Sequence, residues 1–299
     1  MYCNFEEMIA EVKKYPRATI SVAVAQDKDV LTAVKLARDA GIAEALLVGD
    51  ASMITPLLKE VGLPPDTVVI HEAEIAQAAR KAVFLIKSGQ AQILMKGMIN
   101  SSDFLRAVLQ KDHGLRTGRL LSHLGAFEIP GQKKLLFITD GGMNVAPRLS
   151  EKKEILMNAL LALQGMGIAV PKVALLAANE VVSEKMPATI DARLLAGMGS
   201  ELPAAIIEGP VALDVAVSLE SARHKGIASK IAEDVDVILV PAIETGNALG
   251  KALIYFAQSK MAGVVLGATH PIVMTSRSET PEGKVHSIAL ACLINKPPC

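Results

Sequence analysis

The sequence has no tryptophan and few aromatic residues, which narrows the fold before any motif is considered. Of its 299 residues, 51% are hydrophobic but only 3% are aromatic. A core built from Ala, Val, Ile, Leu and Met suits helices packed on parallel sheets better than an all-β fold. The composition therefore predicts an α/β protein with one large or two medium domains.

Three further absences exclude classes of function. The 31 basic residues balance 31 acidic ones, so the electrostatic footprint of a nucleic-acid-binding protein is missing. Cys3, Cys292 and Cys299 are scattered and form no CxxC pair, which favours reduced thiols in a cytoplasmic protein. No apolar run approaches 18 residues, and the N-terminal segment is a charged amphipathic helix, so we expect neither a membrane span nor a secretory signal.

Several catalytic motifs are missing or incomplete. The segment 246–252 (GNALGKA) resembles a phosphate-binding P-loop, but its spacing is one residue short and the Ser/Thr is missing. There is no GxSxG elbow and no HExxH motif, and the six histidines are spread along the chain. We therefore expect no metal site and no permanently bound cofactor.

A regular alternation of strands and helices begins at residue 18. Strands are predicted at 18–25, 44–48, 67–71 and 92–95, each followed by a helix, which gives four βα units in about 110 residues and a doubly wound sheet. Segments 119–128 and 133–139 then flank a turn and predict an antiparallel hairpin. The alternation resumes with strands at 172–177, 204–208 and 235–240, and with helices at 150–165, up to about 232, and at 244–258. We predict a first α/β domain of residues 1–147 and 266–299, and a second of residues 148–265.

The segment 263–294 joins a buried strand end to the start of a helix. Its apolar runs, 263–266 and 271–274, are typical of strands buried on both faces of a parallel sheet. Thr280 and Pro281 predict the N-cap and first position of a helix, and Glu282 lies in its first turn. The apolar residues that follow, at helical spacing, predict one buried stripe: Val285, Ile288, Ala289 and Cys292.

The polar residues between that strand and that helix predict an anion site. Thr275, Ser276 and Arg277 bring two hydroxyls and a guanidinium to a helix N-terminus. Main-chain N–H groups and the helix dipole favour anions there, and arginine presents a planar fork that matches phosphate. Many such loops carry these residues only as caps and solvated surface, so the rest of the chain has to support the prediction.

Other strand ends carry polar or glycine-rich loops as well. In open α/β sheets the ligand binds beyond the carboxyl ends of the strands. The candidates there, which we predict to contact substrate, are Lys96, Ser101, Ser102 and Arg106 in one loop and helix, Asn144 in the loop 140–148, Gly246 and Asn247 after the strand 235–240, and Thr275.

Four segments in order resemble the phosphate acetyl/butyryltransferases. They are 140–144 (DGGMN), 208–210 (EGP) with Asp214, 240–247 (VPAIETGN) and 271–277 (PIVMTSR). The segment 185–189 (KMPAT) and the chain length look closer to the phosphate butyryltransferase branch.

The resemblance implies a reversible reaction in which acyl-CoA and phosphate give acyl phosphate and CoA, with butyryl-CoA as the acyl donor. It also implies two α/β domains with a cleft between them, a fold like that of isocitrate and isopropylmalate dehydrogenases, and a homo-oligomer. A phosphate acetyltransferase and a non-catalytic protein that binds acyl-CoA or an anion remain alternatives.

The resemblance also implies catalytic residues. By motif match Ser276 and Arg277 lie in the active site. In the acetyl branch an aspartate seven residues after that serine is proposed as the base for the CoA thiol, but here the position is Gly283. Glu282 is the predicted substitute, although its alternative role is to stabilise the helix dipole. None of the three cysteines follows a strand, so we expect direct transfer in a ternary complex.

Overall fold

The computed structural model describes residues 2–276 and 279–296, and the chain forms two compact units. The N-terminal unit comprises Asn4–Arg119 and Ala262–Cys299, and the central unit comprises Met1–Cys3 and Leu120–Met261. The sequence predicts one domain boundary after residue 147, beyond the hairpin, and another after residue 265. The compact units divide ahead of the hairpin because the second hairpin strand pairs with a strand of the central unit.

The sheet of the N-terminal unit is largely parallel. Its order is β3-β2-β1-β4-β11-β10, with β1 Ala18–Ala23, β2 Ala43–Gly49, β3 Val69–His71, β4 Ile93–Lys96, β10 Lys260–Leu266 and β11 Ile272–Val273. Strands β1, β2, β3, β4 and β11 run parallel, whereas β10 is antiparallel to β11. The parallel direction predicted for 263–266 was therefore wrong. An unbroken apolar run reports burial on both faces, which β10 has, and not strand direction.

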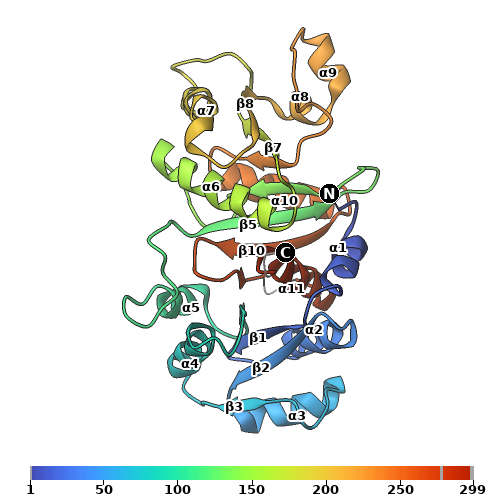
Figure 1. Cartoon of the computed structure of the whole chain (residues 1–299), viewed down its shortest axis with the longest axis vertical. Coiled ribbons are helices and arrows are strands. Elements are labelled where there is room, and N and C mark those ends of the chain that lie inside the picture. The colour runs from blue at the N-terminus through green and yellow to red at the C-terminus, as the bar shows by residue number, and fades with distance from the viewer. Residues whose placement is uncertain (1, 277–278, 297–299) are drawn as a thin grey trace. The chain divides into compact units, whose positions relative to one another are not determined.

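Helices cover both faces of this sheet (Figure 1). They are α1 Phe5–Val12, α2 Lys28–Asp39, α3 Ala51–Val61, α4 Ile75–Lys87, α5 Ser101–Val108 and α11 Pro281–Ile294. Helix α11 packs against α1 and α2, while α4 packs against α5 and β1. Because α1 and α2 cover its outer side, α11 is buried almost all round, from Gly283 to Leu293, and not along a single stripe as the sequence predicted.

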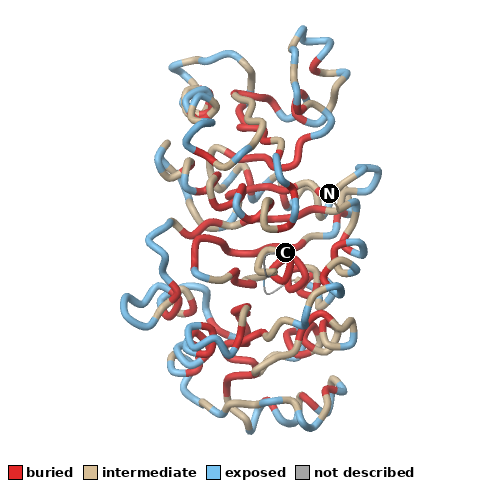
Figure 2. The backbone as a smooth tube through the Cα atoms, viewed as in Figure 1, coloured by how far each residue is buried: buried red, intermediate tan, exposed pale blue. Residues whose placement is uncertain are grey.

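The strands of the central unit follow the order β5-β6-β9-β7-β8. The strands are β5 Ser122–Glu128, β6 Leu136–Thr139, β7 Lys172–Leu176, β8 Ile206–Val211 and β9 Val237–Leu239. Strands β5 and β6 form the predicted antiparallel hairpin, and the remaining neighbours are parallel. In both units most strand residues are buried (Figure 2).

The helices of the central unit are α6 Leu149–Gly165, α7 Pro187–Gly197, a 3-10 turn Gly199–Glu201, α8 Leu213–Val217, α9 Leu219–His224 and α10 Ile243–Tyr255. Ile238 packs in a core cluster with residues of α8, α9 and α10, whereas its neighbour Leu239 faces α6 and α7. The two helix groups therefore cover opposite faces of the sheet. The mixed α/β class predicted from the sequence is confirmed.

The helix predicted to run to about residue 232 was wrong, because α9 ends at His224. The Glu208 carboxylate accepts bonds from the Ser229 hydroxyl (2.6 Å) and the Lys230 main-chain N–H (2.7 Å). These bonds to a distant strand hold the segment in a turn. In the part of the chain that the structure describes, no helix is long and apolar enough to cross a membrane.

Candidate functional site

The carboxyl ends of β4 and β11 lie side by side and bring two predicted loops together. The strands are parallel, with Leu94 opposite Ile272 and Met95 opposite Val273. This register places Lys96 level with Met274 and one residue short of Thr275. Lys96 is only 8% exposed, an unusual position for a lysine at a sheet edge. A buried cation therefore lies at the same edge as the hydroxyls of the predicted anion site.

The loop between β11 and α11 has the helix start that the sequence predicted. Thr280 is the N-cap, and its hydroxyl oxygen accepts from the Gly283 main-chain N–H at 3.1 Å. Pro281 is the first helical residue. The main-chain N–H of Glu279 donates to the carbonyl of the exposed Ser276 at 3.1 Å, ahead of the helix. Arg277 and Ser278 lie outside the described residues, so the predicted role of Arg277 stays a prediction.

Helix α5 presents its polar residues to solvent. Ser101 and Ser102 are exposed in its first turn. Arg106 donates to Asp103 on the same helix at 2.8 Å, with 77% of its side chain exposed. Exposed pairs of this kind stabilise little, so a phosphate group could displace the aspartate at low cost. The roles predicted for these residues in substrate binding remain predictions.

In the central unit, the loop after β6 is organised by Asp140. One carboxylate oxygen accepts from the main-chain N–H groups of Gly142 and Met143, both at 2.9 Å. The other accepts from the Asn144 side-chain amide at 2.6 Å and from its main-chain N–H at 3.3 Å. This buried carboxylate, 2% exposed, is thus an acceptor for its own loop.

Asn144 uses its amide donors to hold this loop in place. Besides its bond to Asp140, the amide nitrogen donates to the Leu121 carbonyl at 2.8 Å. An amide has two N–H donors, so the group left for a ligand is the side-chain oxygen. The predicted contact between Asn144 and the substrate would therefore be a hydrogen bond that the side-chain oxygen accepts from the substrate.

Gly246 and Asn247 lie beside the Asp140 loop. Strands β6 and β9 are parallel neighbours, and the Ile243 main-chain N–H, at the start of α10, donates to the Val145 carbonyl at 3.0 Å. A Cβ on Gly246 would lie 2.6 Å from the Cα of Gly141, so the two main chains touch. Gly246 is buried and Asn247 is exposed. The structure gives Gly246 a packing role, and its predicted role in substrate binding is a separate hypothesis.

His123 on β5 packs against the same loop. A Cβ on Gly142 would lie 3.1 Å from the His123 ring. Burial lowers the pKa of His123, and the charge of Asp140 opposes this shift without cancelling it. The ring is therefore neutral at pH 7 and is a candidate hydrogen-bonding group rather than a cation.

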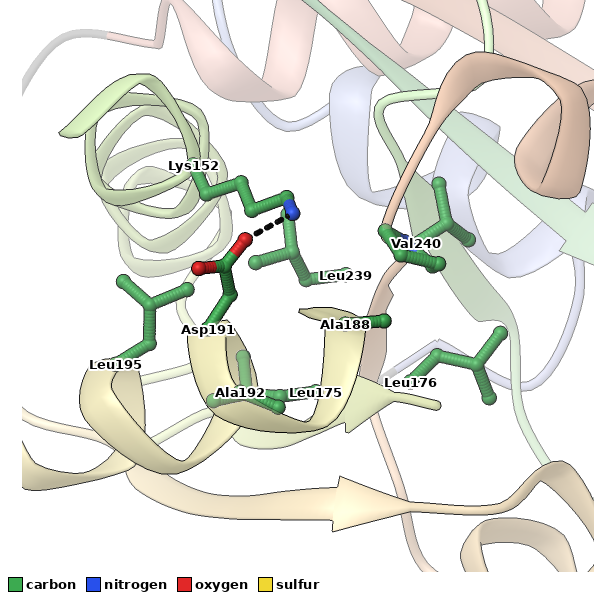
Figure 3. A pocket seen from close by; sticks show the side chains of 10 residues that line it. Lys152, Leu175, Leu176, Ala188, Asp191, Ala192, Leu195, Leu239 and Val240 are labelled. Atoms are coloured by element: carbon green, nitrogen blue, oxygen red, sulfur yellow. Dashed lines mark hydrogen bonds and ion pairs between the residues drawn. The ribbon is translucent and has the colours of Figure 1, made fainter. Parts of the chain in front are cut away.

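An ion pair between a buried lysine and a partly buried aspartate borders a small cavity at the carboxyl ends of β7 and β9 (Figure 3). Lys152 of α6 is 6% exposed, and its Nζ lies 2.6 Å from Asp191 of α7. The cavity measures about 10 Å³, room for one water molecule. Its other lining is apolar: Leu175, Leu176, Ala188, Ala192, Leu195, Leu239, Val240 and Pro241. The pair joins the two helices on this face of the sheet.

The described cysteines are poor candidates for covalent catalysis. Burial raises the pKa of Cys292, on α11, to about 12, so its thiol stays protonated at neutral pH. Cys3 is exposed and precedes α1, and Cys299 lies outside the described residues. Within residues 2–276 and 279–296, no three His, Cys, Asp or Glu side chains are grouped closely enough to hold a metal ion.

Several residues with prominent contacts in the structure had no role predicted from the sequence: Asp140 and His123, Lys152 and Asp191, and Glu279 and Lys284. The sequence around Lys152 and Lys284 gave no signal, since Lys152 stands between Glu151 and Lys153, and Lys284 follows Gly283 in the first turn of its helix. Both are buried, 6% and 4% exposed. Burial of a lysine requires a partner, and those partners are visible only in three dimensions.

A family model described as Phosphate acetyl/butaryl transferase matches residues 66–292. The chain belongs to this family. The match spans the β4 and β11 loops of the N-terminal unit and the Asp140 and Gly246 segments of the central unit. The resemblance stated from the sequence is confirmed.

Relatives match the chain over nearly its whole length. It is 42% identical over 297 residues to the phosphate butyryltransferase of Clostridium acetobutylicum, covering 98% of this chain and 99% of the relative. It is 35% identical to the phosphate acetyltransferase of Thermotoga maritima, covering 97% and 99%. A crystal structure of a branched-chain phosphotransacylase from Enterococcus faecalis is 33% identical, with a TM-score of 0.83, covering 94% of this chain and 100% of the other.

Proposed function

We propose that the protein is a phosphate butyryltransferase that transfers a short acyl group reversibly between CoA and inorganic phosphate. The observation that carries this is its 42% identity, over 98% of the chain, to a phosphate butyryltransferase, against 35% for the phosphate acetyltransferase of T. maritima. Its partners are then acyl-CoA, as a substrate rather than a bound cofactor, and phosphate. We further propose a cytoplasmic homo-oligomer.

The mechanism we propose is direct transfer between two bound substrates. Phosphate is held by Ser276 and Arg277, with main-chain N–H groups of the same loop, and the buried charge of Lys96 lies at this sheet edge. A phosphate oxygen attacks the thioester carbonyl, the C–S bond breaks and CoA leaves. Holding both reactants replaces a bimolecular encounter, and donors aimed at the developing oxyanion stabilise the transition state.

The state of the Cys292 thiol supports direct transfer, without an intermediate in which the acyl group is bound to a cysteine. Cys292 is buried on α11 and protonated at neutral pH, and its thiol donates to the Ile42 carbonyl at 3.9 Å. In the ternary complex, phosphate itself is the nucleophile. Of the carboxylates near the loop, Glu282 is the base predicted from the sequence.

The experiment that tests the function is thiol release from butyryl-CoA, acetyl-CoA and isobutyryl-CoA, each with and without phosphate. The branched substrate is included because the E. faecalis relative is titled a branched-chain phosphotransacylase. Phosphate-dependent release that is fastest with butyryl-CoA is the expected result. Faster release with acetyl-CoA would make the chain a phosphate acetyltransferase, and binding of CoA without release would favour a non-catalytic protein.

A further inference from the structure

The side chain of Glu279 fills the space beside Gly283. A Cβ built on Gly283 would lie 2.2 Å from Oε1 of Glu279, 2.7 Å from its Cδ and 3.0 Å from its Cγ. Such distances are far inside van der Waals contact, so any side chain at position 283 would have to displace this carboxylate. The carboxylate thus takes the place that a side chain of the first turn of α11 would occupy. Because residue 283 is a glycine and has no side chain, the Glu279 carboxylate can occupy this space.

Three bonds fix Glu279 in this position. Its Oε1 accepts from the Thr280 main-chain N–H at 3.2 Å, and its own main-chain N–H donates to the Ser276 carbonyl at 3.1 Å. The Nζ of Lys284 donates to the Glu279 carbonyl. Lys284 is 4% exposed, so this bond is shielded from solvent. The loop therefore holds the carboxylate before any substrate binds, which a catalytic group requires.

Gly283 is held equally firmly on the other side. Its carbonyl accepts from the Ser287 hydroxyl at 3.0 Å, and the oxygen of that hydroxyl accepts from the Gly263 main-chain N–H of β10 at 2.9 Å. The main chain cannot move away from the Glu279 carboxylate without breaking both bonds. The geometry is therefore a property of the sheet and the helix together.

The other carboxylate of this segment lies in a different environment. Glu282 is exposed in the first turn of α11, whereas Glu279 is partly buried just ahead of the N-cap of that helix. An exposed acid in a first turn stabilises the helix dipole. Glu279 lies three residues after Ser276, and a main-chain hydrogen bond joins the two. Glu279 is thus the better-placed acid for work at the phosphate site.

We propose that Glu279, rather than Glu282, is the general base for the CoA thiol; this rests on the proposed function. In the direction of acyl-CoA synthesis the Glu279 carboxylate takes the thiol proton. The sulfur electron pair then attacks the acyl carbon of the acyl phosphate, forming the C–S bond. The C–O bond breaks, and phosphate leaves with its electron pair and accepts the proton from Glu279. In the reverse direction Glu279 returns a proton to the departing thiolate.

The first test is Glu279→Gln, which keeps shape and removes the base. CoA acylation by butyryl phosphate should fall by about a hundredfold or more near pH 7. The deficit should shrink as pH rises, because solution chemistry then supplies the thiolate. Glu220→Gln, an exposed acid in the first turn of α9, is the matched control and should behave as wild type. A deficit of equal size at every pH would indicate a structural role and overturn the proposal, as would a pH-dependent loss in Glu282→Gln.

The second test moves the carboxylate. Glu279→Ala should lose activity as Glu279→Gln does, and adding Gly283→Asp should recover much of it, because the new side chain enters the space that Glu279 vacated. Gly283→Asp alone should be impaired by the clash with Glu279. A folded double variant without recovery would overturn the assignment. A wild-type protein without phosphate-dependent turnover would instead overturn the proposed function, and this inference with it.

Discussion

The main chains of Gly141 and Gly246 touch, which locks the loop after β6 to the first turns of α10. A Cβ on Gly141 would lie 2.8 Å from the carbonyl carbon of Gly246, and one on Gly246 would lie 2.6 Å from the Cα of Gly141. Both neighbours are main-chain atoms and cannot rotate away. The loop that carries Asn144 and the helix that carries Asn247 are therefore positioned against each other by a contact between glycines.

Gly246→Ala should destabilise the protein even though alanine favours helices. Overpacking of this kind costs roughly 1–3 kcal/mol, and we expect a lower urea midpoint with an unchanged slope. Gly197→Ala is the control, because Gly197 ends α7 with nothing within 4 Å of its Cβ position. It should be neutral or stabilising by about 0.5–1 kcal/mol. Equal stability of Gly246→Ala and wild type would refute the contact.

Removing one partner of the Lys152–Asp191 ion pair should lower the free energy of unfolding, whereas replacing both partners with apolar residues should lower it much less. Lys152→Ala leaves a carboxylate facing the apolar cavity, and we expect a loss of roughly 3 kcal/mol, the lower end of the range because Asp191 is partly exposed. The double change Lys152→Met with Asp191→Leu should restore most of it. Chemical denaturation of the three proteins measures this. A double variant as unstable as the single one would show that the pair contributes more than charge compensation.

His123 should make stability fall in mild acid. Burial lowers its pKa in the folded state, so below the ordinary histidine value of about 6.5 the unfolded chain binds a proton that the folded chain does not. Stability is then lost as pH falls from about 7 toward 5. Unfolding free energies of His123→Gln should change less across this range than those of wild type. His224→Gln on exposed α9 should keep the wild-type slope, and an unchanged slope in His123→Gln would contradict the account.

Cys292 should be neither reactive nor required. With its pKa raised to about 12, its thiol should resist iodoacetamide in the folded protein and react after unfolding, as peptide mass mapping would show. Cys292→Ser should keep phosphate-dependent turnover, with some loss of stability from the buried hydroxyl. Complete loss of turnover in a folded Cys292→Ser protein would point to an acyl-enzyme.

Arg277 should matter mainly for phosphate. Arg277→Ala removes a bidentate donor, and we expect turnover to fall several hundredfold or more, with a raised KM for phosphate and little change in the KM for butyryl-CoA. Arg277→Lys keeps the positive charge but loses the planar guanidinium, and its turnover should lie between those of wild type and Arg277→Ala. Near-normal kinetics of Arg277→Ala would remove this loop from the active site.

Local sequence signals predicted the parts of the fold that depend on neighbours along the chain. Thr280 and Pro281 mark the start of α11 because capping involves residues three apart. The end of α9 was missed although it carries a local signal: Gly226 adopts a φ of +68°, and the Ile227 main-chain N–H donates to the Ala222 carbonyl at 2.9 Å, which closes the helix. The direction of β10 was missed because apolar runs record burial alone.

The candidate site likewise has a part that the sequence predicts and a part that only the structure reveals. The residue types at the strand ends indicated the loops, since polar residues cluster there in α/β sheets. The position of Glu279 over Gly283 and the pairing of Lys152 with Asp191 depend on side-chain contacts between segments. No periodicity or spacing encodes such contacts, so these residues emerged only from the structure.

The most direct measurement of the central claim is phosphorus NMR of the protein with butyryl-CoA and inorganic phosphate, with released CoA counted in parallel. Transfer between two bound substrates predicts one butyryl phosphate for each CoA released, and no CoA release when phosphate is left out. CoA released without an acyl phosphate signal would show hydrolysis of the thioester and contradict a phosphate butyryltransferase.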